Sequence, residues 1–253
     1  MRFASLGSGS AGNAWVVEAD STRVLIDCGF GPRELVRRLH RLGIEPDSIA
    51  AIAVTHEHSD HVGGAPACAR RFGWPVFLTR GTAASLNGQT TGFAATMIES
   101  QTLLSVGSLE IRPYTVPHDA REPVQFVVSD GQRKLGLLTD AGHATRHMID
   151  ALGGCDALVL ECNHDANLLR AGRYPQFLKQ RISSPWGHLE NSAAAGLLAA
   201  LDCSRLQQVV AAHLSEQNNR PELARMALAT VLGCTPDWIA VADQETGLDW
   251  RDV

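Results

Sequence analysis

Residues 55–64 read THEHSDHVGG, and this stretch decides the fold that we predict for the chain. It directly follows the apolar run 49–54, whose length and β-branched residues predict a buried strand that ends in a polar loop. The loop contains four candidate metal ligands, namely His56, His58, Asp60 and His61. The first two imidazoles are two residues apart and project from the same side of an extended segment, so one ion can bind both. The other two ligands follow where the chain turns towards a helix, which indicates a second, adjacent metal.

The types of ligand narrow the class of metal site. Imidazole and carboxylate groups suit zinc, manganese or iron, whereas the absence of cysteine from residues 55–64 disfavours a closed thiolate site of the zinc-finger kind. The plainer alternative is a solvated surface loop that happens to be rich in histidine. Such a loop has no reason to carry this order of residues directly after a buried strand.

The stretch resembles the HxHxDH signature of the metallo-β-lactamase fold, and its tail Gly63-Gly64 also fits that superfamily. The resemblance implies an α/β protein, a four-layer αββα sandwich of two similar halves, with the metals held between loops at one edge of the two sheets. The sequence shows no internal repeat, linker or low-complexity segment. We therefore expect residues 1–253 to form a single metallo-β-lactamase-like hydrolase domain.

The composition is that of an ordinary globular protein, with 45% hydrophobic and 19% charged residues. A net charge of −5 gives no overall electrostatic argument for binding nucleic acid or an anionic membrane, although two bound dications would change the charge locally. Six cysteines without CxxC spacing indicate buried, reduced thiols. The N-terminus lacks an export signal, and no apolar run reaches the length of about 20 residues that a membrane span needs. We expect a cytoplasmic protein that does not insert into membranes.

The hydrophobic pattern divides the rest of the chain into strands and helices. We predict strands at 2–6, 15–19, 23–27, 75–79, 124–129, 134–139, 157–160 and 207–212, with two more between 103 and 116. We predict helices at 32–42, 62–72, 191–201 and 221–232, a helical stretch that ends at about 182, and a hairpin over 238–250. Residues 80–100 have the composition of an exposed loop.

Polar residues recur where apolar strands end, which is where layered α/β proteins assemble their sites; they are His56, His118, Asp140, Glu161 and His213. By resemblance to the superfamily, one metal is bound by His56, His58 and His118, the other by Asp60, His61 and His213, and Asp140 bridges them. Asp27 either supports the metal loop from behind, as the resemblance implies, or caps the next helix. Two zinc or manganese ions would produce a bridging hydroxide at neutral pH, which predicts hydrolysis of an ester, amide or phosphodiester.

Four further segments, GSGSAGNA, LECNHD, GHLEN and HLSEQNN, resemble the YycJ (WalJ, VicX) family of small metallo-β-lactamase proteins over nearly the whole chain. The resemblance implies a DNA exonuclease that works from 5′ to 3′, with DNA as partner. RNA is the less expected substrate, because the chain has no room for the second domain of RNase J and lacks the arm of RNase Z. His188 corresponds to the histidine that protonates the leaving oxygen in those enzymes; otherwise it caps the helix at 191.

The remaining candidates concern the substrate and the orientation of His188. Glu161 is expected to orient His188 or a ligand histidine by hydrogen bonding, and we group Asp60, His188 and Glu161 as catalytic. The loop 7–13 can present backbone amides to an anion, or it is a plain tight connection. Basic residues are interleaved with aromatic residues before His188. They form either a track for single-stranded nucleic acid or the charged outer face of an ordinary helix. The candidate substrate contacts are Ser8, Asn13, Arg173, Lys179 and Arg181.

Two other functions remain compatible with the sequence. One is a metallohydrolase of small substrates, such as a cyclic phosphodiester, a thioester or a lactone. The other is a non-catalytic accessory protein that keeps a metal only for folding. An open basic groove would favour the nuclease, and a closed apolar pocket would favour the small-substrate enzyme. The sequence makes no prediction of oligomeric state.

Overall fold

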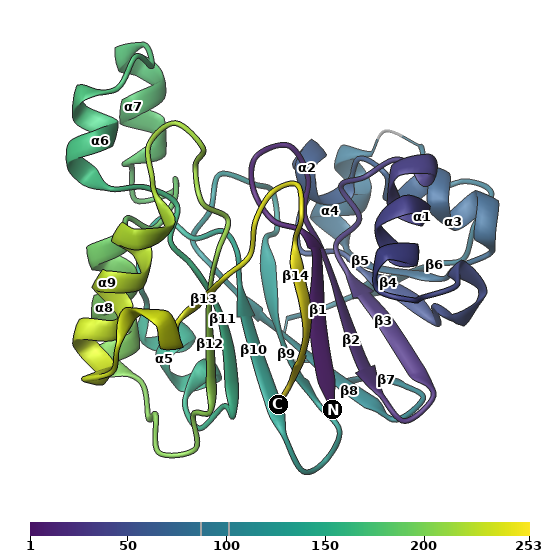
Figure 1. The fold of residues 1–253 in the computed structure, drawn as a ribbon. Helices are drawn as coiled ribbons and strands as arrows, with labels where there is room; N and C mark the ends of the chain where they lie inside the picture. The colour runs from purple at the N-terminus through teal and green to yellow at the C-terminus, as the bar shows by residue number, and fades with distance from the viewer. Residues whose placement is uncertain (87, 101) are drawn as a thin grey trace.

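The computed structural model describes residues 1–86, 88–100 and 102–253, and their strands form two mixed sheets packed face to face (Figure 1). The first sheet contains, in spatial order, β14 (Leu248–Asp252), β1 (Arg2–Gly7), β2 (Ala14–Ala19), β3 (Thr22–Ile26), β4 (Ala51–Ala53), β5 (Val76–Thr79) and β6 (Ala95–Ile98). The second contains β13 (Ala240–Val241), β12 (Gln208–Ala212), β11 (Ala157–Glu161), β10 (Lys134–Leu138), β9 (Val124–Ser129), β8 (Leu109–Thr115) and β7 (Leu104–Val106).

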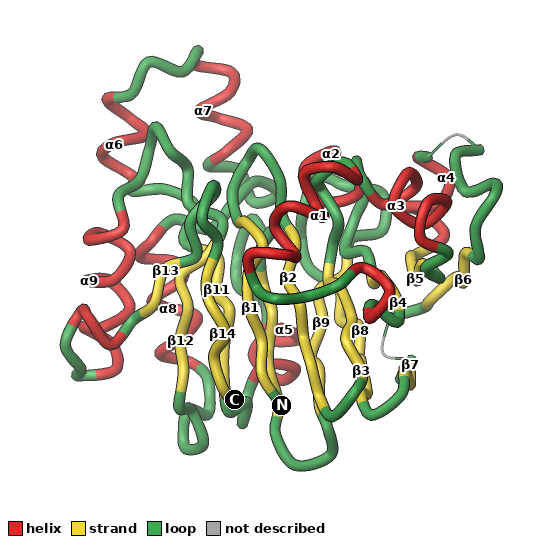
Figure 2. The backbone as a smooth tube through the Cα atoms, turned by 45° about the vertical axis from the view of Figure 1, so that its right-hand side comes forward, coloured by secondary structure: helices red, strands yellow, loops and turns green. Residues whose placement is uncertain are grey.

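Helices cover the outer face of each sheet (Figures 1 and 2). The helices on the first sheet are α1 (Pro32–Arg41), α2 (Ser59–Val62), α3 (Ala65–Phe72) and α4 (Arg80–Ser85). The helices on the second sheet are α5 (Arg146–Leu152), α8 (Asn191–Ala200) and α9 (Pro221–Leu232). Two more helices, α6 (Ala166–Ala171) and α7 (Gln176–Ile182), project beyond one end of the sandwich, and short 3-10 turns occur at Pro46–Ser48 and Pro236–Trp238. These layers confirm the predicted αββα sandwich.

Apolar side chains fill the three spaces between the four layers. Phe3 and Val17 from the first sheet meet Phe126 from the second in the central layer. Alternate residues of the same strands face outward, so Val16 packs beneath the helices of the first sheet. Because both faces of each sheet are covered, the strands read as nearly continuous apolar runs. Within the described residues, no helix is both long and apolar enough to cross a membrane.

Parallel strands in one half of each sheet decide where the loops gather. β3, β4, β5 and β6 run parallel in the first sheet, as do β10, β11, β12 and β13 in the second. The loops that follow these strands lead to α2, α6 and α7, all at one end of the molecule, whereas both chain termini lie at the opposite end (Figure 1). The topology therefore brings polar residues from distant parts of the chain to one edge.

Two of the predicted segments are wrong in the first half of the chain. The range 80–100 contains α4 and β6, although Asn87 lies outside the described residues. The side chain of Thr79 caps α4 by accepting a hydrogen bond from the amide of Thr82, and this cap begins a helix in a segment whose composition is typical of a loop. The predicted helix 62–72 is two helices, because the amide of Gly64 donates to the carbonyl oxygen of Cys28 at 2.8 Å instead of to the preceding turn, and Pro66 has no amide hydrogen to donate.

Two other differences lie in the second half. The helical stretch before 182 is broken into α6 and α7 by Gly172 and Pro175, and α5 was not predicted. The predicted hairpin 238–250 is wrong, because β13 pairs with β12 in the second sheet and β14 pairs with β1 in the first. Only a tight turn around Gly247, whose φ is 65°, connects these two strands.

Asp156 joins three segments of the second sheet and gives a prediction about stability. Its side chain is 1% exposed and accepts hydrogen bonds from the amide of Lys134 (2.9 Å), from Arg133 (3.0 Å) and from Arg205 (3.0 Å). Burial alone would raise the pKa of Asp156, but these donors outweigh it and lower the pKa. We expect Asp156→Ala to reduce the free energy of unfolding by about 2–3 kcal/mol, measured by urea denaturation at pH 7.

The pH dependence of this effect has a defined sign. Because the pKa of Asp156 is lower in the folded than in the unfolded state, its contribution is present above the unfolded pKa of about 4 and is lost as the pH falls through the folded value. The urea midpoints of wild type and Asp156→Ala should therefore approach each other in acid. Equal urea midpoints of wild type and Asp156→Ala at pH 7 would contradict the prediction. The control is Asp47→Asn, which changes an exposed carboxyl group.

Candidate metal centre

The edge formed by the loops brings together all seven of the predicted metal ligands. Four of them lie on the loop between β4 and α2 and on α2 itself, and the other three follow β8, β10 and β12. They are His56, His58, Asp60, His61, His118, Asp140 and His213. Each lies at a strand end or in the first turn of α2, as the sequence predicts.

One group of ligand atoms consists of the ring nitrogens of His56, His58 and His118, which lie within 4.8 Å of one another. His118 Nδ1 is hydrogen-bonded to the carbonyl oxygen of Gly187 at 2.9 Å, so that Nε2 faces the group and approaches His58 Nδ1 to 3.2 Å. Burial lowers the pKa of His56 well below its usual value, which keeps the imidazole neutral with a free lone pair. A neutral imidazole is the form that binds a metal.

A second group consists of Asp60, His61 and His213, whose ligand atoms also lie within 4.8 Å of one another. Asp60 Oδ2 lies 3.3 Å from His61 Nε2 and 3.4 Å from His213 Nε2. Asp140 stands between the two groups, because its Oδ2 lies 2.9 Å from His61 and its Oδ1 lies 3.7 Å from His118. The carboxylate of Asp140 is therefore placed to be shared.

Unpaired buried atoms test whether these residues fit a divalent metal. Within the described part of the chain, His56 Nε2 is buried without a hydrogen bond, and Asp140 Oδ2 and both ring nitrogens of His213 are buried with other candidate ligands as their polar neighbours instead of well-aligned hydrogen-bond partners. Leaving such atoms unpaired is costly, and a cation at the centre would remove the cost. Burial alone would lower the pKa of His61, yet Asp140 and Asp60 raise it well above its usual value, which reflects an excess of negative charge. Imidazole nitrogens and carboxylate oxygens around such a centre fit a divalent cation.

His188 lies beside this cluster and is held by Glu161. His188 Nδ1 is 2.7 Å from Glu161 Oε1 and 3.2 Å from Asp140 Oδ1. Glu161 is fully buried, and its Oε2 accepts hydrogen bonds from the amides of Ala141 (2.8 Å) and Leu189 (3.2 Å). Burial alone would lower the pKa of His188, but Glu161 and Asp140 outweigh it and raise the pKa to about 9. The capping alternative is wrong, because Glu190 occupies the N-cap of α8.

A hollow of about 360 Å³ opens over the cluster. One side of this hollow is formed by His58, Asp60, Asp140 and His188. The other side is formed by residues on α7 or just before it, namely Tyr174, Leu178, Arg181 and Ile182. Arg181 Nε forms an ion pair of 2.6 Å with Asp119 Oδ2. Because Asp119 directly follows His118, this pair connects α7 to the metal cluster. Asp119 was not among the site residues predicted from the sequence, although its position next to the predicted ligand His118 indicates that it lies near the site.

Residues 22–214 match the profile of the family described as the β-lactamase superfamily domain. The chain belongs to this superfamily. It is also similar to the exodeoxyribonuclease YycJ of Bacillus anthracis, with 34% identity over 92% of this chain and 89% of the relative. The exodeoxyribonuclease WalJ of Streptococcus pneumoniae is 30% identical over 99% of this chain and 92% of the relative. These matches confirm membership of the YycJ-type family.

The solved structures add a comparison of the fold. Zinc-bound PqqB of Methylobacterium extorquens superposes on this chain with a TM-score of 0.78, covers 100% of both chains, and shares 18% sequence identity. At this identity the likeness supports the fold alone. It agrees with the layered architecture of the two packed sheets.

Two of the candidate substrate contacts bond to candidate metal ligands instead of facing the hollow. Ser8 is 1% exposed, and its hydroxyl accepts a hydrogen bond from the amide of His213 at 2.9 Å. Asn13 is fully buried, and its Nδ2 lies 3.2 Å from Asp60 Oδ2 and 2.9 Å from the carbonyl oxygen of Gly9. Ser10 of the same loop is exposed and lines the hollow. The loop therefore acts mainly as a support for the ligands.

The three cationic candidates are placed differently from one another. Arg181 lines the hollow over the cluster. Lys179 lies on another face of α7, where its Nζ donates to the carbonyl oxygen of Arg170 at 2.7 Å. Arg173 is exposed before α7 and does not line the hollow over the cluster. The structure therefore brings only Arg181 of these three to the metallo-β-lactamase site.

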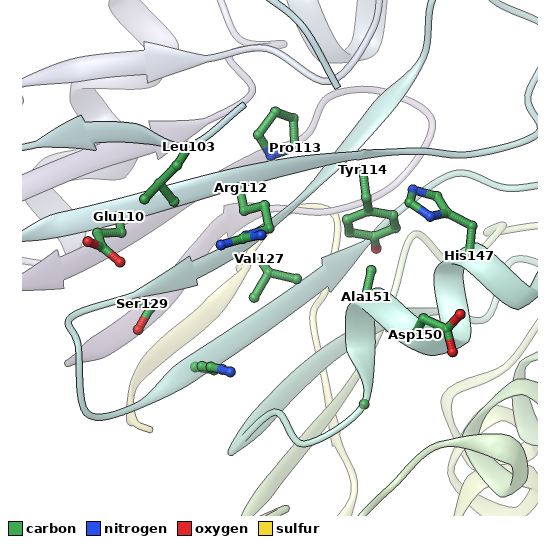
Figure 3. Close-up of a pocket in the computed structure, with 12 residues that line it drawn as sticks. Leu103, Glu110, Arg112, Pro113, Tyr114, Val127, Ser129, His147, Asp150 and Ala151 are labelled. Atoms are coloured by element: carbon green, nitrogen blue, oxygen red, sulfur yellow. The ribbon is translucent and has the colours of Figure 1, made fainter. Parts of the chain in front are cut away.

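A larger hollow of about 510 Å³ lies elsewhere, on the outer face of the second sheet beside α5 (Figure 3). Tyr114 and His147 meet edge to face at one end of it, with ring centroids 6.4 Å apart. Arg112 and Glu110 lie along β8 towards the other end. These side chains are of mixed charge and come from a different part of the fold than the metal ligands, so the smaller hollow is the candidate active site.

Asp27 supports the cluster from behind and gives a prediction about metal affinity. Its φ is 63°, which is rare for a residue with a side chain, and its Oδ2 lies 2.7 Å from His61 Nδ1. Its Oδ1 accepts a hydrogen bond from the amide of Thr55 at 2.8 Å. We expect Asp27→Asn to weaken metal binding about 10- to 100-fold, measured by competition with a chelator, because the orientation of His61 is lost. Unchanged affinity would contradict this role; the matched control is Asp47→Asn, which changes an exposed carboxyl group.

Proposed function

We propose that this YycJ-type protein is a metal-dependent phosphodiesterase that binds two divalent ions and removes nucleotides from the 5′ end of single-stranded DNA. The observation that carries the proposal is the single hollow in which the ligand cluster, His188 and Arg181 meet. The names of the two curated relatives support an exonuclease acting on DNA. The 5′ to 3′ direction comes from the resemblance to the YycJ family.

The residues divide into two ligand sets with one shared carboxylate. His56, His58 and His118 would hold one ion, and Asp60, His61 and His213 the other, with Asp140 contributing to both. Two zinc or manganese ions held in this way would supply a nucleophile at neutral pH and neutralise charge on the phosphate. Asp27, Asn13 and Ser8 fix the positions of the ligands from outside.

His188 supplies the proton in this proposal. Its Nδ1 is engaged with Glu161, which leaves Nε2 to donate to the leaving oxygen of the phosphodiester. Glu161 acts as a positioning residue, because it is fully buried and bonds the imidazole on the side away from a substrate. The two carboxylates beside His188 favour the protonated form that a general acid requires.

Side chains on α7 account for recognition of the substrate. Arg181 is 60% exposed, and its guanidinium is held near the cluster by Asp119, where it can pair with a phosphate. Leu178 and Tyr174 present apolar surface to a sugar or base on the same side of the hollow. A volume of about 360 Å³ accommodates a group of roughly the size of one nucleotide, which favours removal of terminal nucleotides.

Degradation of end-labelled DNA tests the proposal. Single-stranded and duplex substrates labelled at the 5′ or the 3′ end are incubated with the protein and manganese or zinc. A 5′ label should be released first as a mononucleotide, and a 3′ label should remain on a shortening ladder. Internal fragments, or first release of the 3′ label, would contradict an exonuclease of this polarity.

The size of the hollow also favours a second candidate, a hydrolase of small cyclic phosphodiesters. The same preparation should then open cyclic nucleotides and cleave bis-p-nitrophenyl phosphate while leaving every DNA substrate intact. A protein that binds metal and hydrolyses none of these esters would instead support the accessory role.

A further inference from the structure

Another hollow lies behind α7, on the side away from the metal centre. We call it the second hollow, because α7 separates it from the hollow over the metal centre. It has a volume of about 290 Å³ and is lined by residues of α6, α7 and the segments next to α8. Leu169 and the buried His164 provide ring and apolar surface, and Arg170 and Lys179 provide positive charge. The lining also includes the carboxylate of Glu190, which accepts a hydrogen bond from Ser192. Nothing in the proposed chemistry uses this hollow.

The two hollows share α7 as a common wall. Leu178, Arg181 and Ile182 line the hollow over the metal centre, whereas Gln176, Lys179, Gln180 and Ser183 line the second one. Spacings of three and four residues place each set on its own face of the helix. Because a helix with its side chains is only about 10–12 Å across, a short flexible ligand can reach from one hollow to the other over α7.

Phe177 stands on the crest between these two faces. It lines neither hollow, and at 72% exposure it is the most exposed large apolar side chain of the described residues. Figures 1 and 2 show α7 projecting from the body of the protein, so that its crest is open to solvent. An aromatic ring in such a position offers a free face on which a nucleic-acid base can stack.

We propose that the second hollow is a nucleotide subsite for the single DNA strand, and that the strand reaches it by crossing α7 with one base stacked on Phe177. The proposal rests on the proposed function and extends it from one nucleotide to a path along the strand. The Arg170 guanidinium is exposed and donates to Asn167 Oδ1 at 3.2 Å, which leaves further N–H groups for a phosphate. Lys179 uses one of its three N–H donors for the carbonyl oxygen of Arg170.

The dependence of cleavage on substrate length tests the path. KM is measured for 5′-phosphorylated single strands from dinucleotide to dodecanucleotide. Phe177→Ala and Phe177→Leu should raise KM for the dodecanucleotide about tenfold and leave the dinucleotide and bis-p-nitrophenyl phosphate unchanged, whereas Phe177→Tyr should behave as wild type. Met226→Ala, which removes a side chain on α9 that is 59% exposed, is the matched control.

Arg170→Gln tests the second hollow itself. It should raise KM for the dodecanucleotide only, and it should reduce the slope of log affinity against log salt by about 0.7, as expected for one lost phosphate contact with a single strand. Binding is measured independently with hydrolysis-resistant phosphorothioate strands that carry 2-aminopurine at successive positions. At one position of the strand, binding to the wild-type protein should quench the 2-aminopurine fluorescence, and binding to Phe177→Ala should not.

The possible results separate this proposal from the proposed function. Equal effects of the Phe177 variants on dinucleotide and dodecanucleotide, or no effect on either, would overturn the crossing of α7. An unchanged KM and salt slope in Arg170→Gln would overturn the subsite. In both cases DNA degradation by the wild type would stand. Absence of any DNA cleavage by the wild type, with turnover of bis-p-nitrophenyl phosphate, would overturn both the nuclease and the path.

Discussion

Asp60→Asn is expected to lower the rate of DNA degradation by about 10³-fold or more, because losing one ion removes several kcal/mol of transition-state stabilisation. The reason lies in the second ligand group. Asp60 is its only carboxylate apart from the shared Asp140 in the described structure, and it lies between His61 and His213. Burial alone would raise the pKa of Asp60, but these two histidines hold it well below its usual range. An asparagine has the same shape and lacks the charge.

Metal content distinguishes this explanation from simple unfolding. Elemental analysis of Asp60→Asn should show about one ion fewer per chain than the wild type, while a cooperative urea transition shows that the variant is still folded. The urea midpoint should be lower, because the variant loses both the interactions of the Asp60 carboxylate with the two histidines and a bound ion that stabilises the folded state. Asp47→Asn makes the same substitution at an exposed carboxyl group and should keep full activity. A variant that loses an ion and still degrades DNA at the wild-type rate would refute the assignment.

His188→Ala is expected to reduce kcat by about 10²–10⁴-fold while leaving the metal content unchanged. The loss of activity should depend on the leaving group, since p-nitrophenolate is a stable anion and can leave without being protonated. We therefore expect a much smaller effect of His188→Ala on a p-nitrophenyl ester of a nucleotide than on DNA. An equal loss on both substrates would contradict the role of His188 as an acid, and a loss of metal would show that it acts as a ligand.

The pH profile gives a second test of the same residue. A general acid works in its protonated form, so wild-type activity should fall as the pH rises through the pKa of His188, which its carboxylate neighbours raise to about 9. Bound dications next to Asp140 would lower that pKa. Glu161→Gln removes a group that stabilises the protonated imidazole, so the alkaline fall should move to lower pH. His188→Ala should lack this fall altogether.

The clustering of the candidate metal ligands could be predicted from the sequence because each of these residues is marked by local features. His118, Asp140 and His213 all follow apolar strands, and strands that end at the same edge bring their following residues together. The supporting residues carry no such mark. Ser8 bonds the backbone of His213 across 205 positions of sequence, and Asn13 reaches Asp60 across 47. Contacts of this range depend on the completed fold, so these two residues were interpreted as substrate contacts.

The errors in the predicted fold also have local causes. The segment of α4 and β6 is rich in glycine, threonine and serine, which hid a capped helix and an edge strand. The C-terminal strands β13 and β14 are close in sequence and read as a hairpin. Their pairing with β12 and β1 is decided by which sheet has a free edge, which the sequence pattern does not express.

The pairing of β14 with β1 has a consequence for the order of events during synthesis. Arg2 lies opposite Asp252, so β1 completes its pairing on this side only after residues 248–252 have been synthesised. Such long-range pairing makes folding slow, and the first sheet stays incomplete until β14 has been synthesised. The histidine that follows β12 also needs Ser8 from the other end of the chain. A chain synthesised only as far as β11 therefore cannot assemble the candidate metal centre, because it still lacks His213, and hydrolytic activity should appear only after β12 and His213 have been made.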